Sequence, residues 1–70
     1  MNRDWMAGQW KEFRGDVHER WGKLTNDELD VIAGRREQLI GKIQQLYGTT
    51  REQIEHDLND LWEKKHHAVQ

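Results

Sequence analysis

The sequence contains no cysteine, no serine and no proline. Without cysteine, neither a disulfide nor a thiolate metal site can stabilise the fold, and the chain suits the reducing cytoplasm, where we expect it to reside. Because cysteine and serine are the two commonest catalytic nucleophiles, their absence leads us to expect no enzyme activity. Without proline, no residue of the chain blocks a helix outright.

Long apolar segments are missing too. No stretch approaches the roughly 18 apolar residues of a membrane span, and the N-terminal segment MNRDWMAGQW lacks the apolar run of a signal peptide. We therefore expect neither a membrane span nor a membrane anchor.

A strong charge of either sign is also absent, because 13 acidic and 11 basic residues give a formal net charge of −2. A nucleic-acid-binding domain of this size usually carries a clear basic excess. Nucleic acid is therefore not the partner that we expect.

The residues that are present favour a small folded domain. Only 34% of the residues are hydrophobic and 34% are charged, but four tryptophans supply large surfaces to bury. The 70 residues make one domain near the lower size limit for independent folding. We expect a monomer with a stability of about 3–5 kcal/mol.

Apolar residues recur every three or four positions in four segments, a pattern that predicts four helices. Burying these apolar stripes against one another would give a single core. The predicted core consists of Trp10, Phe13, Val17, Trp21, Leu29, Ile32, Leu39, Ile43, Tyr47, Ile54, Leu58, Leu61 and Trp62.

The helix ends are marked by glycine and threonine. Gly22 follows the first segment and Gly48 follows the third, which spans residues 35–47; glycine often ends a helix because it adopts the left-handed conformation at little cost. Thr25 and Thr50 precede the second and fourth segments, each with a glutamate or glutamine three residues later. This is the spacing of a capping box.

The pattern repeats within the chain. The segment FRGDVHERWG at residues 13–22 matches LIGKIQQLYG at residues 39–48 in its apolar and glycine positions. Because one helical hairpin cannot bury its own apolar faces, the repeat predicts an all-α fold, a compact four-helix unit built from two pseudo-repeated αα-hairpins. We expect residues 1–65 to form this domain and residues 66–70 to be a frayed tail.

Several stretches of the chain carry a resemblance to a known family. They are GQWKEFRGDV at residues 8–17, WGKLTND at 21–27, IAGRREQLIGKIQ at 32–44 and YG at 47–48. Together they resemble the CsbD-like family of small bacterial stress-response proteins, and the resemblance covers most of the chain.

The resemblance implies a stress-induced cytoplasmic protein with a small helical fold, and it supplies no catalytic residues. One departure concerns the first helix. Family members often carry lysines near the positions of Asp16 and His18, so this first helix is less basic than usual. Any role that depends on a basic first helix is weakened here.

Glu52, His56 and Asp60 share one face of the predicted fourth helix; Glu63 and His67 extend this pattern, and His66 is adjacent. Their spacing would suit a divalent ion, but it also arises from weak ion pairs on a solvated helix face, and no zinc-binding motif accompanies it. We expect no metal site and no cofactor.

A candidate interaction surface lies on the first helix. Lys11, Arg14 and His18 form a short basic strip, which is either a weak nucleic-acid-binding site or an ordinary solvated face. Trp5 lies about 100° from the apolar stripe and either covers the helix end or makes an exposed contact. The other tryptophans lie on apolar stripes, which favours the core over stacking on nucleic-acid bases.

Three glycines are unexpected in helices. Gly8, Gly15 and Gly41 lie away from the apolar stripes, where each costs about 1 kcal/mol relative to alanine. They either allow close contact with another helix, in this chain or in a partner, or keep the fold marginally stable.

These observations favour a non-enzymatic bacterial general stress-response protein that acts by binding or protective contact. The biochemical role and the partner are left unidentified. One alternative is a protein–protein adaptor that uses Trp5 and the glycine-bearing faces. A second alternative is a weak nucleic-acid-binding module that uses Lys11 and Arg14.

Overall fold

The computed structural model describes residues 7–67, and the side chains of residues 8–65. A 3₁₀ turn, Ala7–Gln9, leads into four α-helices, and the described residues contain no strand. The prediction of an all-α, four-helix fold is confirmed. The helices are α1 (Trp10–Arg20), α2 (Asn26–Ile32), α3 (Arg36–Tyr47) and α4 (Arg51–His67).

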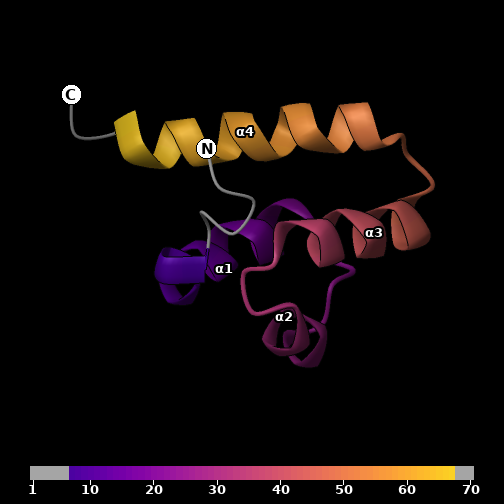
Figure 1. Cartoon of the computed structure of the whole chain (residues 1–70), viewed down its shortest axis with the longest axis horizontal. Helices are drawn as coiled ribbons and strands as arrows, with labels where there is room; N and C mark the ends of the chain where they lie inside the picture. The colour runs from indigo at the N-terminus through magenta and orange to yellow at the C-terminus, as the bar shows by residue number, and fades with distance from the viewer. Residues whose placement is uncertain (1–6, 68–70) are drawn as a thin grey trace.

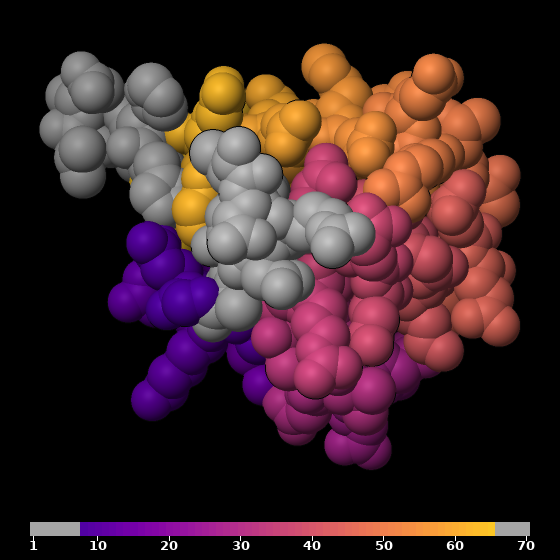
Figure 2. Space-filling view, viewed as in Figure 1, coloured from indigo at the N-terminus to yellow at the C-terminus, as the bar shows by residue number. Residues whose placement is uncertain are grey.

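The helices form three layers. α1 and α3 each pack on both α2 and α4, so they form the middle layer, with α4 on one side and the short α2 on the other (Figure 1). In the space-filling view, the side chains of α3 and α4 meet in one continuous surface (Figure 2). None of the described helices combines the length and apolar character needed to cross a membrane.

All four helices contribute to one hydrophobic core. Leu61 and Trp62 of the predicted core are partly buried against it, and Leu24 and Ile40 are fully buried members beyond the predicted set. Phe13 links α1 to α4, because its ring lies 5.0 Å from that of Trp62 in an edge-to-face arrangement. The predicted core residues that are buried are Trp10, Phe13, Val17, Trp21, Leu29, Ile32, Leu39, Ile43, Ile54 and Leu58.

Tyr47 differs from its predicted place in the core, because its side chain is 38% exposed. Its hydroxyl accepts a hydrogen bond of 3.0 Å from the backbone N–H of Lys23, and the Lys23 ammonium lies 5.1 Å from its ring centre. A buried tyrosine needs a polar partner for its hydroxyl, and Tyr47 finds one at the surface, over the loop that joins α1 to α2. The prediction of Tyr47 as a core residue is wrong.

The capping box predicted at Thr25 is confirmed. The Thr25 hydroxyl accepts from the backbone N–H of Glu28 at 3.1 Å, and the Glu28 carboxylate accepts from the backbone N–H of Thr25 at 2.9 Å. At Thr50 the hydroxyl likewise accepts from the Gln53 N–H at 3.1 Å, but the Gln53 side chain donates instead to Asp57 at 3.0 Å. The first box is reciprocal, whereas in the second the Gln53 side chain is engaged elsewhere.

The glycines at the helix ends behave differently from each other. Gly48 adopts a left-handed conformation with φ of 66° and caps α3, as predicted. Gly22 does not, because α1 ends at Arg20 with Trp21 as its C-cap at φ of −125°, and the positive φ values of the described residues fall on Ala33, Gly34 and Gly48. The prediction of a left-handed stop at Gly22 is wrong, since a backbone turn in which the Leu24 N–H donates to the Trp21 carbonyl reverses the chain.

The last helix extends beyond the predicted domain end at residue 65. α4 continues to His67, so the first two residues of the predicted tail are helical. Residues 68–70 lie outside the described part of the chain.

Candidate functional site: a groove between α2 and α3

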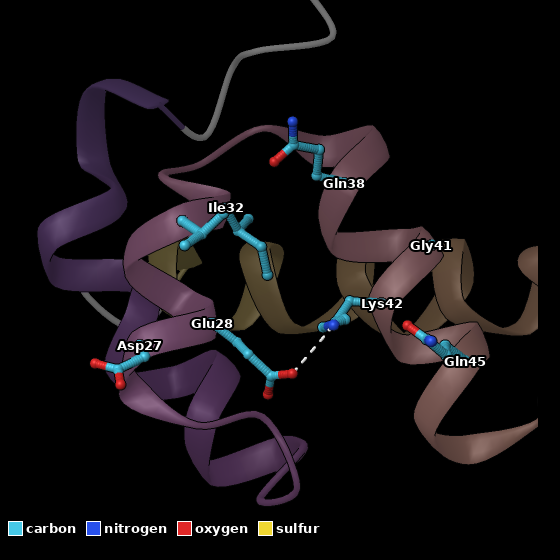
Figure 3. Close-up of a pocket in the computed structure, with 8 residues that line it drawn as sticks. Asp27, Glu28, Ile32, Gln38, Gly41, Lys42 and Gln45 are labelled. Atoms are coloured by element: carbon cyan, nitrogen blue, oxygen red, sulfur yellow. Dashed lines mark ion pairs between the residues drawn. The ribbon is translucent and has the colours of Figure 1, made fainter.

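A groove of about 410 Å³ runs between α2 and α3 (Figure 3). Its size falls within the range of about 300–1,000 Å³ that is typical of ligand-binding clefts. α2 forms one wall and α3 the other. The lining residues are Asp27, Glu28, Val31, Ile32, Gln38, Gly41, Lys42 and Gln45.

Gly41 opens the α3 side of this groove. A Cβ atom built on Gly41 would meet no atom of the described residues within 4 Å, so none of them covers the backbone of α3 at this point. Ile32 of α2 is 3% exposed and joins the groove to the core, whereas Val31 beside it is 73% exposed. The groove therefore combines a buried apolar residue, an exposed apolar residue and an uncovered helix backbone.

One ion pair spans the groove. The Lys42 ammonium of α3 lies 3.1 Å from the Glu28 carboxylate of α2, as the dashed line in Figure 3 marks. The backbone N–H of Thr25 lowers the pKa of Glu28, and the Lys42 ammonium lowers this pKa further. Glu28 is therefore ionised at neutral pH, and the pair ties the two walls together.

The edge of the groove is negatively charged. Glu28 and Lys42 offset each other, and the glutamines at positions 38 and 45 are neutral. Asp27 is exposed, lies on the side of α2 away from α3 in Figure 3, and has no ion-pair partner among the residues that the structure describes. One unpaired carboxylate thus distinguishes this edge.

The basic strip predicted on α1 lies outside the groove. Arg14 pairs with Asp30 and also donates a 3.2 Å hydrogen bond to the Asn26 carbonyl, which fastens α1 to α2. The Nδ1 atom of His18 lies 2.8 Å from the Leu24 carbonyl and donates to it. Only Lys11 of the strip is exposed without a contact of this kind in the described structure, and Trp5 lies outside the described residues.

Many of the other basic side chains also join helices to one another. Ion pairs cross each of the four helix interfaces, and exposed pairs of this sort contribute only about 0–1 kcal/mol each. The pairs between helices are Arg14–Asp30, Arg20–Asp57, Lys42–Glu28, Arg36–Glu55, Arg51–Glu37 and Lys65–Asp16.

The described tryptophans are engaged in packing. Trp10 is 7% exposed and its indole N–H donates a 3.1 Å hydrogen bond to the Leu29 carbonyl of α2. Trp21 is buried, and Trp62 packs on the core. Trp10 and Trp21 therefore offer no free ring face for stacking on a base, and Trp62 is partly covered by the core.

The histidine and carboxylate face of α4 forms no metal cluster in the described part of the chain. Asp60 lies 3.9 Å from Lys64 instead, in a pair one helical turn apart. This arrangement matches that of a solvated helix face.

The groove was missed by sequence reasoning. Val31 and Gly41 were its available signals, since one is an apolar residue off the stripe of its helix and the other a glycine inside a helix. Neither shows which helix lies beside it, because the groove depends on how α2 and α3 pack.

The fold is a small all-helical unit with an open groove between α2 and α3. The model of the CsbD-like family matches residues 4–56, which include every residue that lines the groove. The chain therefore belongs to the CsbD-like family.

Curated relatives match nearly the whole chain. The UPF0337 protein YjbJ of Escherichia coli O6:H1 is 52% identical over 66 residues, covering 94% of each chain. YjbJ of Escherichia coli strain K12 is 49% identical over 65 residues, covering 93% of each. A UPF0337 protein of Protochlamydia amoebophila is 48% identical over 64 residues, covering 91% of this chain and 97% of the relative. No solved structure matches the chain.

Proposed function

We propose that this chain is a non-enzymatic protein of the bacterial general stress response that acts in the cytoplasm by binding another protein through the α2–α3 groove. The observation that carries the proposal is the open groove of about 410 Å³, which lies within the segment that the family model matches. Family membership supports the stress-related role, and the lack of cysteine fits the cytoplasm.

The titratable groups of the groove support binding over catalysis. A general acid at neutral pH needs a raised carboxyl pKa, but contacts with the Thr25 N–H and Lys42 lower the pKa of Glu28. Lys42 is occupied by the same ion pair. Asp27 lies at the exposed edge of the groove, away from the buried Ile32.

A protein–protein adaptor is the form of binding that the geometry favours. Val31 is 73% exposed, and apolar side chains beside a groove commonly anchor protein partners. The weak nucleic-acid-binding alternative has less support, because Arg14 and His18 are held by contacts within the chain.

Complementation in stressed cells tests the proposal. Cells that lack the gene would receive the natural protein, a Gly41→Leu variant or a Gly15→Leu variant, and survival after salt or heat stress would be measured. Gly15 is the matched control, because it occupies the equivalent place in α1 and a Cβ there also meets no atom within 4 Å.

The natural protein and Gly15→Leu should restore survival, whereas Gly41→Leu should not, because leucine would fill the groove. Circular dichroism would verify that both variants stay folded. Full protection by Gly41→Leu would refute binding through the groove. Normal survival of cells without the gene would refute the role in stress.

A further inference from the structure

We propose that the groove receives an amphipathic helix of a partner protein, which inserts a bulky apolar side chain between Val31 and Gly41 and presents a basic side chain to Asp27. This inference rests on the proposed function, because it names the chemistry of the protein that the groove binds. It goes beyond family membership, which identifies no partner.

The apolar part of the groove fits a helix. Gly41 lies in the middle of α3 with no side chain, so a second helix can approach the backbone more closely here than over a larger residue. Val31 lies on the opposite wall and is 73% exposed. An apolar anchor from an amphipathic helix would cover both residues, which is how many helical segments dock.

The charge of α2 selects a basic partner. This helix carries three acidic residues and no basic one in its sequence NDELDVI. Asp30 is paired with Arg14 and Glu28 with Lys42, which leaves Asp27 unpaired in the described structure. A lysine or arginine on the partner would complete the set of pairs, and it would affect specificity more than affinity.

A second copy of the chain is a poorer occupant. A two-fold contact brings the same patch of each copy together, so the two Asp27 carboxylates would lie in one interface without an available cation from the groove. The unpaired charge therefore favours a different, basic protein.

Two synthetic helical peptides with the same leucine stripe test the inference. One peptide carries lysine and arginine on its polar face, and the other carries glutamate and aspartate. Each would be titrated into the ¹⁵N-labelled full chain, and backbone amide shifts would be followed. The basic peptide should bind more tightly and shift the amides of the residues that line the groove.

Three variants make the test specific. Gly41→Leu should weaken the basic peptide by about tenfold or more, whereas the matched Gly15→Leu should bind like the natural chain. Asp27→Lys should move the preference toward the acidic peptide. Circular dichroism would verify the fold of each variant.

Several outcomes would overturn the inference. Shifts that map outside the groove, or equal binding by Gly41→Leu, would show that the groove is not the docking site. Equal binding of both peptides would refute the basic partner. Groove shifts that appear on concentrating the chain alone would identify a second copy as the occupant.

The peptide and survival experiments separate the two proposals. If Gly41→Leu loses protection while neither peptide binds the natural chain, the groove functions with a partner of different chemistry, and only this inference fails. If Gly41→Leu protects cells fully although the basic peptide binds as expected, the proposed function fails and the docking chemistry stands.

Discussion

The first pair of helices, α1 and α2, and the second pair, α3 and α4, bury side chains at matching positions of the sequence repeat. The two pairs differ in the turn that joins their helices and in the length of the second helix. Phe13 and Val17 in α1 and Leu39 and Ile43 in α3 occupy matching places of the sequence repeat, and all four are fully buried. After these matching segments, α2 has 7 residues and α4 has 17. The repeat therefore accounts for which residues face the core and leaves turn geometry and helix length to local sequence.

The difference in length has a structural consequence. α4 is long enough to pack along α1 and α3, whereas the short α2 leaves part of the α3 surface uncovered as a groove. The inequality of the two pairs thus creates the candidate binding site. The description of the fold as two pseudo-repeated αα-hairpins stays a prediction from the sequence.

The largest effect should come from truncating the matching core positions. Phe13→Ala should destabilise the fold by about 3–5 kcal/mol and Leu39→Ala by about 2–5 kcal/mol, because both side chains are fully buried. Either change is comparable to the whole stability of so small a domain. Far-UV circular dichroism during thermal and denaturant unfolding would measure the loss. A cooperative melt near that of the parent would show that the two pairs do not share one core.

Removing the threonine caps should destabilise the fold less than truncating the core does, and by different amounts in the two helix pairs. Thr25→Ala should cost about 1–2 kcal/mol and Thr50→Ala about 0.5–1 kcal/mol, because only the box at Thr25 is reciprocal. Urea unfolding of both variants would give the two free energies. A larger loss at Thr50 would reverse this ranking of the boxes.

The turn glycines should respond in opposite ways. Gly48→Ala should destabilise the fold by about 1 kcal/mol, because a residue with a Cβ is strained at a φ of 66°. Gly22→Ala should change the stability little, since its φ is not positive and a Cβ there would lie 3.9 Å from the His18 carbonyl, an ordinary contact. Urea unfolding of both variants would measure the two changes in the free energy of unfolding. Equal losses would show that Gly22, like Gly48, adopts a left-handed conformation at the end of its helix.

These turns show which features of the fold can be predicted from the sequence. The apolar spacing predicted four helices, and the threonine spacing predicted the capping box at Thr25, because both depend on residues within one or two helical turns. Matching positions did not behave alike where a distant partner intervened. Trp21 is buried and its counterpart Tyr47 is exposed, since the Tyr47 hydroxyl bonds to the backbone of a different loop.

The candidate site was harder to predict, for the same reason. Arg14 and Lys11 look alike in sequence, but Asp30 of another helix engages only Arg14. The left-handed Ala33, with φ of 52°, likewise gives no signal in its residue type, because alanine normally favours helix. The ion pairs between helices and the groove between α2 and α3 can be identified only when the packing of the helices is known.

The glycines within α1 and α3 should give a smaller and favourable change. Gly15→Ala and Gly41→Ala should each stabilise the fold by up to about 1 kcal/mol, because a Cβ at either position meets no atom within 4 Å and alanine favours helix. Within the described part of the chain, no other helix lies in close contact with the backbone at these two positions. Denaturant unfolding would measure the gain, and loss of stability in either variant would contradict the open surroundings.

The smallest effect should be a dependence on acid that distinguishes the two capping boxes. The first box contains the ionisable Glu28, whose pKa is lowered from its ordinary value of 4.5 by the Thr25 N–H and by Lys42, and the second contains the neutral Gln53. Because this pKa is lower in the folded chain than in the unfolded chain, ionised Glu28 stabilises the fold above pH 4.5. That contribution is lost as the pH falls below 4.5 and through the folded-state pKa.

Glu28→Gln should therefore reduce the loss of stability between neutral and acidic pH, as measured by urea unfolding at a series of pH values. Lys42→Gln should reduce it by a smaller amount, because the Thr25 N–H is the main cause of the shift and would stay in place. Thr50→Ala serves as the control, since the second box contains no titrating carboxyl at the Gln53 position and the acid-dependent loss should match that of the parent. If Glu28→Gln and the parent lost stability in parallel, Glu28 would not carry the acid sensitivity. The ion pair across the groove would then contribute little to holding α2 and α3 together.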